Sequence, residues 1–319
     1  MKLSHWHRAR GDQVYFTRSI HRGLFEPDYE RVYGSIIFDF NADRLAQFKA
    51  EWPNAIIGGT GAGSHLLNFT VEDLIGQAYE HYDYSAYPTF SDSIGFTQRG
   101  CRLNCGFCSV RRKEGKPRSI NTIHDLWRGE PWPKRIRLLD NDFFGQPPEQ
   151  WRARILEMRE GGYRVNITQG INIRLIDQEA AEALASIEYR DTKFRRRKLY
   201  TAWDNLKDEG VFFRGVERLR IAGIPPTHLR VYMLVGYDPS ETWGRIFYRF
   251  ERMTAMGIQP FVMVKDRTRI DLRAFQRWAN RGLYRIVPWS EYRSPSRVHF
   301  LSVARESHSW PEVYRKVRD

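Results

Sequence analysis

Cysteine is scarce in this chain of 319 residues, which contains only Cys101, Cys105 and Cys108. An odd number of thiols confined to one short segment argues against a disulfide framework. Such a cluster indicates metal binding or catalysis. Thiols stay reduced in the cytosol, and thiolates are strong ligands for soft metals. The central question posed by the sequence is therefore what these three thiols hold.

Long apolar runs are also missing. No segment approaches the ~20 apolar residues that a membrane-spanning helix needs, and "MKLSHWHRARGD" at the start lacks the apolar core of a secretion signal. We expect a cytoplasmic protein with no membrane partner.

Acidic residues are in deficit. The 51 Lys and Arg residues exceed the 38 Asp and Glu residues, which gives a net charge of +13. Such an excess favours anionic partners, among them nucleic acids and phosphorylated metabolites. The densest basic runs are "RRKEGKPR" (111–118) and "KFRRRK" (193–198). The second run precedes a predicted strand, and this position weakens its claim to hold substrate at the opposite end of that strand.

Residues 1–90 predict a small α/β domain. "YGSIIFDF" (33–40) and "NAIIGG" (54–59) are short apolar runs that predict buried strands, and the segment between them has helical spacing. The stretch "GGTGAG" (58–63) lacks both the dinucleotide fingerprint and the Lys-Ser or Lys-Thr pair of a phosphate-binding loop. A glycine-rich turn is the better interpretation.

Residues 91–265 alternate between predicted strands and helices. Helical patterns cover 147–162, 206–224 and 240–258. The second places Phe212, Val216, Leu219 and Ala222 on one face, and the third has Ser240 as a candidate cap. Repeated strand–helix–strand units imply parallel pairing with right-handed crossovers, and six units are too few for a closed eight-unit barrel. We expect an α/β fold with an open, partial (β/α)6 barrel, followed at 266–319 by an extension with helices near 271–281 and 310–317. The predicted strands are 93–98, 135–139, 163–168, 198–203, 229–235 and 259–264.

The cysteines follow the first of these strands with C-x-x-x-C-x-x-C spacing. Three thiolates do not complete the four-ligand shell of structural zinc, so a zinc site would need a histidine, and His81 and His124 are nearest in sequence. A four-iron cubane held by three cysteines instead keeps one iron without a protein ligand. Such an open position is where a substrate or cofactor can bind.

"CRLNCGFC", with Phe107 just before the last cysteine, resembles the signature of the radical S-adenosylmethionine superfamily. The resemblance implies a 4Fe-4S cluster on Cys101, Cys105 and Cys108, with S-adenosylmethionine chelating the fourth iron. It also implies reductive cleavage of that cofactor to a 5′-deoxyadenosyl radical, which abstracts hydrogen from a substrate. The partial barrel of that superfamily agrees with the six-strand pattern.

The resemblance extends to cofactor contacts at the carboxyl ends of later strands. "LLDNDFFG" follows the second strand, where the superfamily has a polar motif for the amino group of S-adenosylmethionine, although the usual Gly-Gly-Glu form is absent. "NITQGINIRLI" follows the third, and "TAWDNL" ends the fourth with polar groups suited to a ribose or substrate. The cofactor-binding residues that we expect are Phe107, Asp140, Asn141, Asp142, Gln169 and Arg174.

The scarcity of cysteine also narrows the choice within the superfamily. Methylthiotransferases, peptide maturases with cysteine-rich tails and RNA methylases with a methyl-carrying cysteine all need further thiols. The N-terminal domain resembles, in place and size, the cobalamin-binding domain of one subgroup. Its Asp-x-His-x-x-Gly motif is degenerate here, because His7 lies four residues before Gly11 and position 5 is His5. We therefore expect a truncated or degenerate relative and no cobalamin cofactor, with binding of cobalamin without a histidine ligand as the open alternative.

The leading hypothesis is a radical S-adenosylmethionine enzyme that modifies a nucleic acid or nucleotide-like substrate and receives electrons from a reductant such as flavodoxin or ferredoxin. One alternative keeps the enzyme and changes the substrate to a peptide or small metabolite. Another is a zinc-containing nucleic-acid-binding protein. The sequence singles out no catalytic residue beyond the metal ligands.

Overall fold

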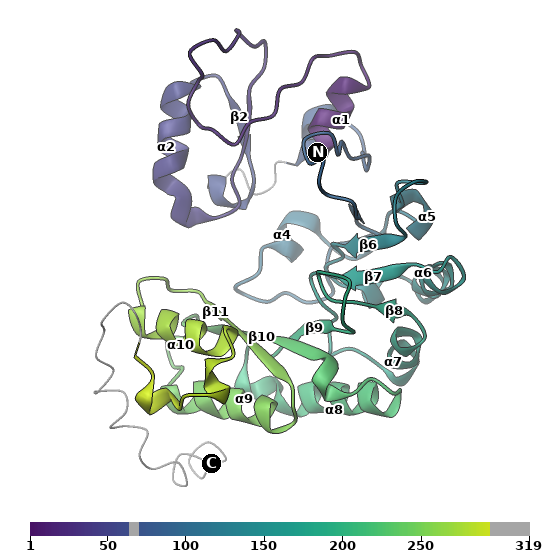
Figure 1. The fold of residues 1–319 in the computed structure, drawn as a ribbon, viewed down its shortest axis with the longest axis vertical. Helices are drawn as coiled ribbons and strands as arrows, with labels where there is room; N and C mark the ends of the chain where they lie inside the picture. Colours follow the sequence, from purple (N-terminus) through teal and green to yellow (C-terminus); the bar gives the residue numbers. More distant parts are fainter. Residues whose placement is uncertain (64–69, 294–319) are drawn as a thin grey trace. The chain divides into compact units, whose positions relative to one another are not determined.

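The computed structural model describes residues 1–63 and 70–293. The chain divides into two compact units, each described here by itself (Figure 1). The first contains residues 1–91 together with the cysteine-bearing segment 100–116, and the second contains residues 92–99 and the chain from Pro117 onward. Within the described ranges no helix has both the length and the apolarity to cross a membrane.

The first unit is built around one short pair of parallel strands, in which Tyr33 lies opposite Ile56. Gly59 follows the second strand at a φ of +100°, and a Cβ atom there would lie 2.1 Å from the carbonyl oxygen of Ile36. Glycine is needed at this close approach of two backbone segments, which supports the interpretation of "GGTGAG" as a turn. The elements of this unit are α1 (Lys2–Arg8), β1 (Tyr33–Ser35), α2 (Ala42–Glu51), β2 (Ile56–Gly58), α3 (Val71–Ile75) and α4 (Val110–Glu114).

The predicted buried strand at 33–40 is only partly correct. The strand ends at Ser35, and the apolar side chains that follow are exposed, with Ile37 at 64% and Phe38 at 53%. A short 3-10 helix, η1 (Asp39–Asn41), replaces the rest of the expected strand. The apolar composition of this segment therefore does not reflect burial within its own unit.

The second unit contains all six predicted strands, and the ladders among them are parallel. One sheet has the order β3-β6-β7-β8 and the other has the order β11-β10-β9. Three short strands were not predicted: β8, which extends the first sheet, and the antiparallel pair β4–β5. The strands are β3 (Ser93–Gly95), β4 (Gln98–Arg99), β5 (Arg118–Ser119), β6 (Arg135–Leu138), β7 (Arg164–Ile167), β8 (Glu188–Tyr189), β9 (Leu199–Ala202), β10 (Leu229–Val235) and β11 (Gln259–Val264).

Hydrogen bonds just beyond the end of β7 join the two sheets. The amide of Ile171 donates to the carbonyl of Tyr200 at 2.7 Å, and the Thr201 hydroxyl donates back to the carbonyl of Ile171 at 2.9 Å. Because the six predicted strands run parallel in chain order, their carboxyl ends lie at one edge of the sheets and their amino ends at the other. The α/β class with parallel sheets is thereby confirmed.

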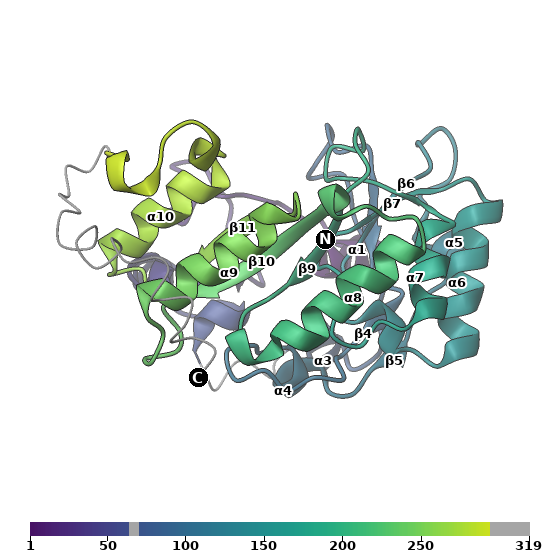
Figure 2. The ribbon, with the colours of Figure 1, turned by 90° about the horizontal axis from the view of Figure 1, so that it is seen from below.

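Helices pack against these sheets, and α8 and α9 lie along the same side of β9 and β10 (Figures 1 and 2). Of the four residues expected on one face of α8, Phe212, Val216 and Leu219 are buried, whereas Ala222 is half-buried at the C-cap. The expected cap of α9 is wrong: Thr242, rather than Ser240, accepts a hydrogen bond from the amide of Arg245. The helices are α5 (Ile123–Leu126), α6 (Pro148–Glu160), α7 (Gln178–Ala185), α8 (Glu209–Ile221), α9 (Trp243–Ala255) and α10 (Ile270–Asn280).

The described core of this second unit is continuous and apolar. Along β10, the side chains alternate between buried and half-buried, with Leu229, Val231, Met233 and Val235 fully inside.

The predicted helix at 271–281 is present as α10, whereas the one at 310–317 lies outside the described residues. Short 3-10 helices complete the elements: η2 (Thr60–Ala62), η4 (Phe143–Gly145), η5 (Leu206–Asp208), η6 (Pro226–His228), η7 (Leu283–Arg285) and η8 (Trp289–Glu291).

Candidate functional site

The cysteine-bearing segment is a hairpin insertion with a fixed neck. Strands β4 and β5 pair in antiparallel fashion, with Arg99 opposite Arg118, and so hold the two ends of the insertion together. Inside the neck, the amide of Cys101 donates to the carbonyl of Gly115 at 3.2 Å. Gly100 has a φ of +83°, and a Cβ atom there would lie 2.2 Å from the carbonyl oxygen of Lys116. Only glycine suits this tight entry into the loop.

The thiols lie in the accessible part of this loop. Cys101 and Cys105 are half-buried and Cys108 is exposed. The amide of Leu103 donates to the Sγ atom of Cys101 at 3.4 Å, and such N–H···S contacts stabilise thiolate charge and tune metal clusters. Arg111, on α4, donates to the carbonyl of Cys101 at 3.1 Å. Its positive charge thus serves the loop backbone as well as the local potential.

The donor set fits a soft metal or an iron–sulfur cluster. Three thiols occupy one anchored loop, Cys101 with an N–H donor to its sulfur, and thiolates are the preferred ligands of iron–sulfur clusters. Residues 1–63 and 70–293 contain no ready-made group of three His, Cys, Asp or Glu side chains around one point.

The histidines proposed for zinc have other contacts. His81 stacks on His5 with ring centroids 5.4 Å apart, and His124 lies 3.1 Å from the hydroxyl of Tyr163 through Nδ1. In the degenerate corrinoid motif, His7 contacts Asp12 through Nδ1 at 2.6 Å and Tyr33 through Nε2 at 3.1 Å. Both ring nitrogens of His7 are thus engaged within the first unit.

Asp140 is one of two predicted cofactor-binding residues, the other being Asp142, whose side chains are inaccessible to solvent. The Oδ1 atom of Asp140 accepts hydrogen bonds from the amides of Thr97 at 2.7 Å and Gln98 at 3.1 Å, while the Thr97 hydroxyl donates to Oδ2. Burial raises the pKa of Asp140 to about 7, against the opposing effect of these hydrogen bonds. The carboxyl group fixes the backbone three residues before Cys101, so it organises the entry to the cysteine loop.

Asn141 and Asp142 continue this turn after β6. The side chain of Asp142 is fully buried and Asn141 is half-buried. The amide of Asp142 donates to Oε1 of Gln98 at 2.9 Å, and Nε2 of Gln98 donates to the carbonyl of Arg99 at 2.7 Å. Through Asp140 and Asp142, the predicted polar motif is therefore tied to the segment that leads into the cysteines.

The residues expected after β7 do not all gather at one point. Gln169 is exposed in the turn that follows the strand. Asn166, which the sequence also places near this end, is fully buried and donates to the carbonyl of Arg190 at 2.8 Å. Arg174 pairs with Asp208 at 3.1 Å. Gln169 is thus open to a ligand, whereas Arg174 would have to share or exchange an existing carboxylate.

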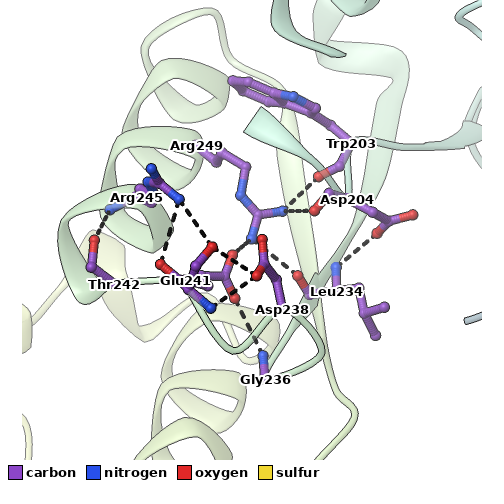
Figure 3. Close-up of polar contacts among 10 residues, drawn as sticks. Trp203, Asp204, Leu234, Gly236, Asp238, Glu241, Thr242, Arg245 and Arg249 are labelled. Atoms are coloured by element: carbon purple, nitrogen blue, oxygen red, sulfur yellow. Dashed lines mark hydrogen bonds and ion pairs between the residues drawn. The ribbon is translucent and has the colours of Figure 1, made fainter. Parts of the chain in front are cut away.

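A polar network at this edge that was missed by sequence reasoning centres on Arg249 of α9 (Figure 3). The guanidinium is 1% exposed and donates to the carbonyls of Trp203 at 2.8 Å, Asp204 at 3.0 Å and Leu234 at 3.0 Å. It also pairs with Glu241. A single buried cation therefore joins the carboxyl ends of β9 and β10.

Two carboxylates complete this network. Oδ1 of Asp204 accepts from the amide of Leu234 at 2.8 Å, and Glu241 accepts from the amide of Gly236 at 3.3 Å. Burial raises the pKa of both Asp204 and Glu241, and the charge of Arg249 partly offsets this effect. The polar residues of "TAWDNL" thus act first in holding strands together.

Comparison with known proteins finds no match to this chain. No protein-family model, no curated protein and no solved structure matches the chain. The function must therefore be argued from the cysteine loop, the strand ends and the chemistry that these residues permit.

Proposed function

We propose that this chain is a radical S-adenosylmethionine enzyme whose second unit is a partial (β/α)6 barrel. The observation that carries the proposal is the position of its only three cysteines, on an anchored loop between the first and second of six parallel strands. Six strands in chain order, with crossover helices between most of them, support the partial barrel. The carboxyl ends of such strands are where α/β folds of this kind place their chemistry.

In this proposal, Cys101, Cys105 and Cys108 would ligate three irons of a 4Fe-4S cluster. With S-adenosylmethionine bound, the cluster would supply reductive cleavage of the sulfonium and a 5′-deoxyadenosyl radical for hydrogen abstraction. The chain itself contributes the fixed neck of the loop, an N–H donor to Cys101 and the excess of nearby positive charge.

The turn after β6 has a supporting role in this scheme. Asp140 and Asp142 are buried and linked to Thr97 and Gln98, so they would hold the start of the loop in place. Asn141, half-buried beside them, is the member of this motif best placed to accept a hydrogen bond from a bound ammonium group. Exposed Gln169 is a further candidate for cofactor contact.

The substrate that we propose is a nucleic acid or nucleotide-like molecule, because the chain carries a net charge of +13. Electrons would come from a small redox protein such as flavodoxin or ferredoxin. A peptide or small-metabolite substrate remains the competing form of the proposal, and it predicts no salt-dependent binding of oligonucleotides.

The test uses the full chain purified without oxygen and reconstituted with iron and sulfide. With dithionite and S-adenosylmethionine, we expect the wild type to form 5′-deoxyadenosine and the Cys105→Ala variant to lose nearly all of this activity. Ser109→Ala, in the same loop but without a thiol or a capping hydrogen bond to lose, is the matched control and should retain it.

Two results would count against the proposal. Equal 5′-deoxyadenosine from the wild type and Cys105→Ala would show that the loop is not involved. Stoichiometric zinc without iron or acid-labile sulfide, measured on the oxygen-free protein as isolated, would favour a zinc-containing nucleic-acid-binding protein instead.

A further inference from the structure

A basic cavity of about 960 Å³ lies at the amino ends of β9, β10 and β11, in the second unit. Eight of the described residues that line the cavity are Lys or Arg. Asp191 is the only acidic residue in the described lining. Tyr200, Arg230 and Gln259 mark the three strands that contribute to its wall. The run "KFRRRK" therefore lies on a concave surface at the amino ends of β9 to β11, the edge opposite their carboxyl ends.

The positive charges around this cavity are poorly compensated. Arg197 and Arg190 share one carboxylate, that of Glu188, with Arg197 at 2.8 Å. Arg195 and Arg196 are exposed, and in the part of the chain that the structure describes no carboxylate lies within 4.0 Å of either guanidinium. A folded protein usually disperses or pairs such charges, because like charges at close range repel one another.

The local electric field reflects this imbalance. Burial and then the neighbouring Arg230 and Arg196 lower the pKa of Lys198. Burial, Lys198 and Arg197 lower the pKa of His228, which also lines the cavity. Burial is the larger cause of both shifts, and an anion placed in the cavity would relieve the smaller part that comes from neighbouring cations.

One buried donor in the wall also lacks an acceptor. The Nε–H of Arg190 is buried, and no hydrogen-bond partner for it exists among the described residues. Buried donors are nearly always paired in folded proteins. Because neighbouring protein atoms cover this N–H, it does not face a ligand in the cavity.

The loop that carries these charges has a defined shape. Oδ1 of Asp191 accepts from the amides of Lys193 at 3.2 Å and Arg195 at 2.9 Å. Phe194 has a φ of +55°, which is uncommon for a residue other than glycine. Its buried ring lies 5.4 Å from the Arg137 guanidinium and anchors the centre of the loop. The cations are thus presented from a constrained backbone.

The composition of the wall indicates the class of ligand. Pockets for small metabolites are lined mainly by apolar and aromatic side chains with a few polar groups, and this cavity has the reverse composition. Tyr200 is 4% exposed and stacks on Tyr232, so it offers no open face to a base. Eight cations exceed the roughly four negative charges of one triphosphate. Repeated phosphates with no base readout fit the wall best.

We infer that this cavity binds the phosphodiester backbone of a nucleic-acid strand, without sequence preference, at the amino ends of β9 to β11. The inference goes beyond the proposed function, because it assigns a second binding surface that does not involve the cysteine loop. It would let the protein retain a polynucleotide by its backbone.

The experiment measures binding of a labelled mixed-sequence single-stranded oligonucleotide, as RNA and as DNA, to the full chain at several salt concentrations. We expect the Arg195→Gln/Arg196→Gln variant to bind roughly tenfold more weakly. The slope of log affinity against log salt should fall by about 1.4, or about 0.7 for each phosphate that is no longer neutralised. Scrambling the oligonucleotide sequence should change neither value.

The matched control is Arg214→Gln/Arg273→Gln, which removes the same charge from exposed positions on α8 and α10. It should bind like the wild type. Equal weakening by both double variants would reduce the effect to net charge and overturn the inference, as would the absence of oligonucleotide binding at low salt. Binding of tripolyphosphate without binding of the oligonucleotide would overturn the inference and reassign the cavity to a small polyphosphate.

The same assay separates this inference from the proposed function. Cys105→Ala should bind the oligonucleotide as the wild type does, even though it makes no 5′-deoxyadenosine. Loss of binding in Cys105→Ala would contradict the independence of the cavity, whereas failure of the wild type to cleave S-adenosylmethionine would leave the binding result intact.

Discussion

The two ends of strands β9 and β10 use arginine in opposite ways. At the carboxyl end, Arg249 is almost completely buried, and three carbonyls and a carboxylate accept its hydrogen bonds. At the amino end, eight Lys and Arg residues surround a cavity in which Asp191 is the only acidic lining residue. At the carboxyl end, which we call the closed end, acceptors of the chain itself compensate the charge. At the amino end, which we call the open end, most of the positive charge has no such compensation.

This difference separates structural charge from charge that is available to a ligand. A buried cation with every acceptor supplied by its own chain has little capacity left for a partner. A group of cations that face one another across a cavity gains stability when an anion arrives. The comparison predicts opposite signs for the same kind of substitution at the two ends.

The largest effect is expected at the closed end. Arg249→Met removes the cation and leaves Glu241 buried without its partner, so we expect the free energy of unfolding to fall by about 3–5 kcal/mol. Chemical denaturation of the full chain measures it. Adding Glu241→Gln to the same variant should recover part of the loss, because the unpaired buried charge is then removed.

Arg252→Met is the control on the same helix. Arg252 is 46% exposed in its side chain and contacts Glu209 at 3.3 Å, so its loss should cost no more than about 1 kcal/mol. Similar losses for Arg249→Met and Arg252→Met would contradict the view that the closed network holds the strand ends together.

The next effect concerns the buried carboxyl of Asp140, at the same edge as Arg249. The pKa of Asp140 is raised from 3.8 to about 7 in the folded chain. Between these pH values the unfolded chain has released the proton that the folded chain retains, so stability falls as pH rises through this interval and levels off above it. The wild type should lose up to about 4 kcal/mol by this route.

Asp140→Asn isolates that contribution, because its amide does not titrate and its oxygen can still accept from Thr97 and Gln98. The difference in free energy of unfolding between variant and wild type, measured at pH values from 4 to about 8, should move in favour of the variant as pH rises. Parallel pH profiles would show that Asp140 is ionised in the folded protein at mildly acidic pH.

The smallest effect is expected at the open end, and it has the opposite sign. Arg195→Gln/Arg196→Gln should raise the free energy of unfolding at low salt by up to about 0.5 kcal/mol, because it relieves repulsion around the cavity. The gain should vanish near 1 M salt, where screening acts over about 3 Å. Destabilisation at low salt would mean that these arginines are paired in solution.

Much of the fold could be predicted because the relevant signals are local. Short apolar runs predicted the six parallel strands, and the spacing of Phe212, Val216 and Leu219 predicted the inner face of α8. The exposed Ile37 and Phe38 were mispredicted as buried. Apolar composition alone does not say whether a surface exists to cover a residue.

The candidate site was predictable only where a motif defined it. The cysteines stand out by spacing, but the hydrogen bonds from Thr97 and Gln98 to Asp140 join residues more than 40 positions apart. Arg249 left one usable signal: it lies three residues after Ile246 and four before Met253, on the buried face of its helix. An arginine at such a position predicts a buried partner, though not which one.

The paired neck formed by β4 and β5 has a consequence for how the thiols meet. Because β4 and β5 hold the ends of the insertion together, the three sulfur atoms belong to a short closed loop and not to an open chain. Tethering of this kind keeps their mutual effective concentration high, roughly in the millimolar range or above. Any ion captured by one thiol therefore meets the other two by an intramolecular step, independent of how dilute the protein is.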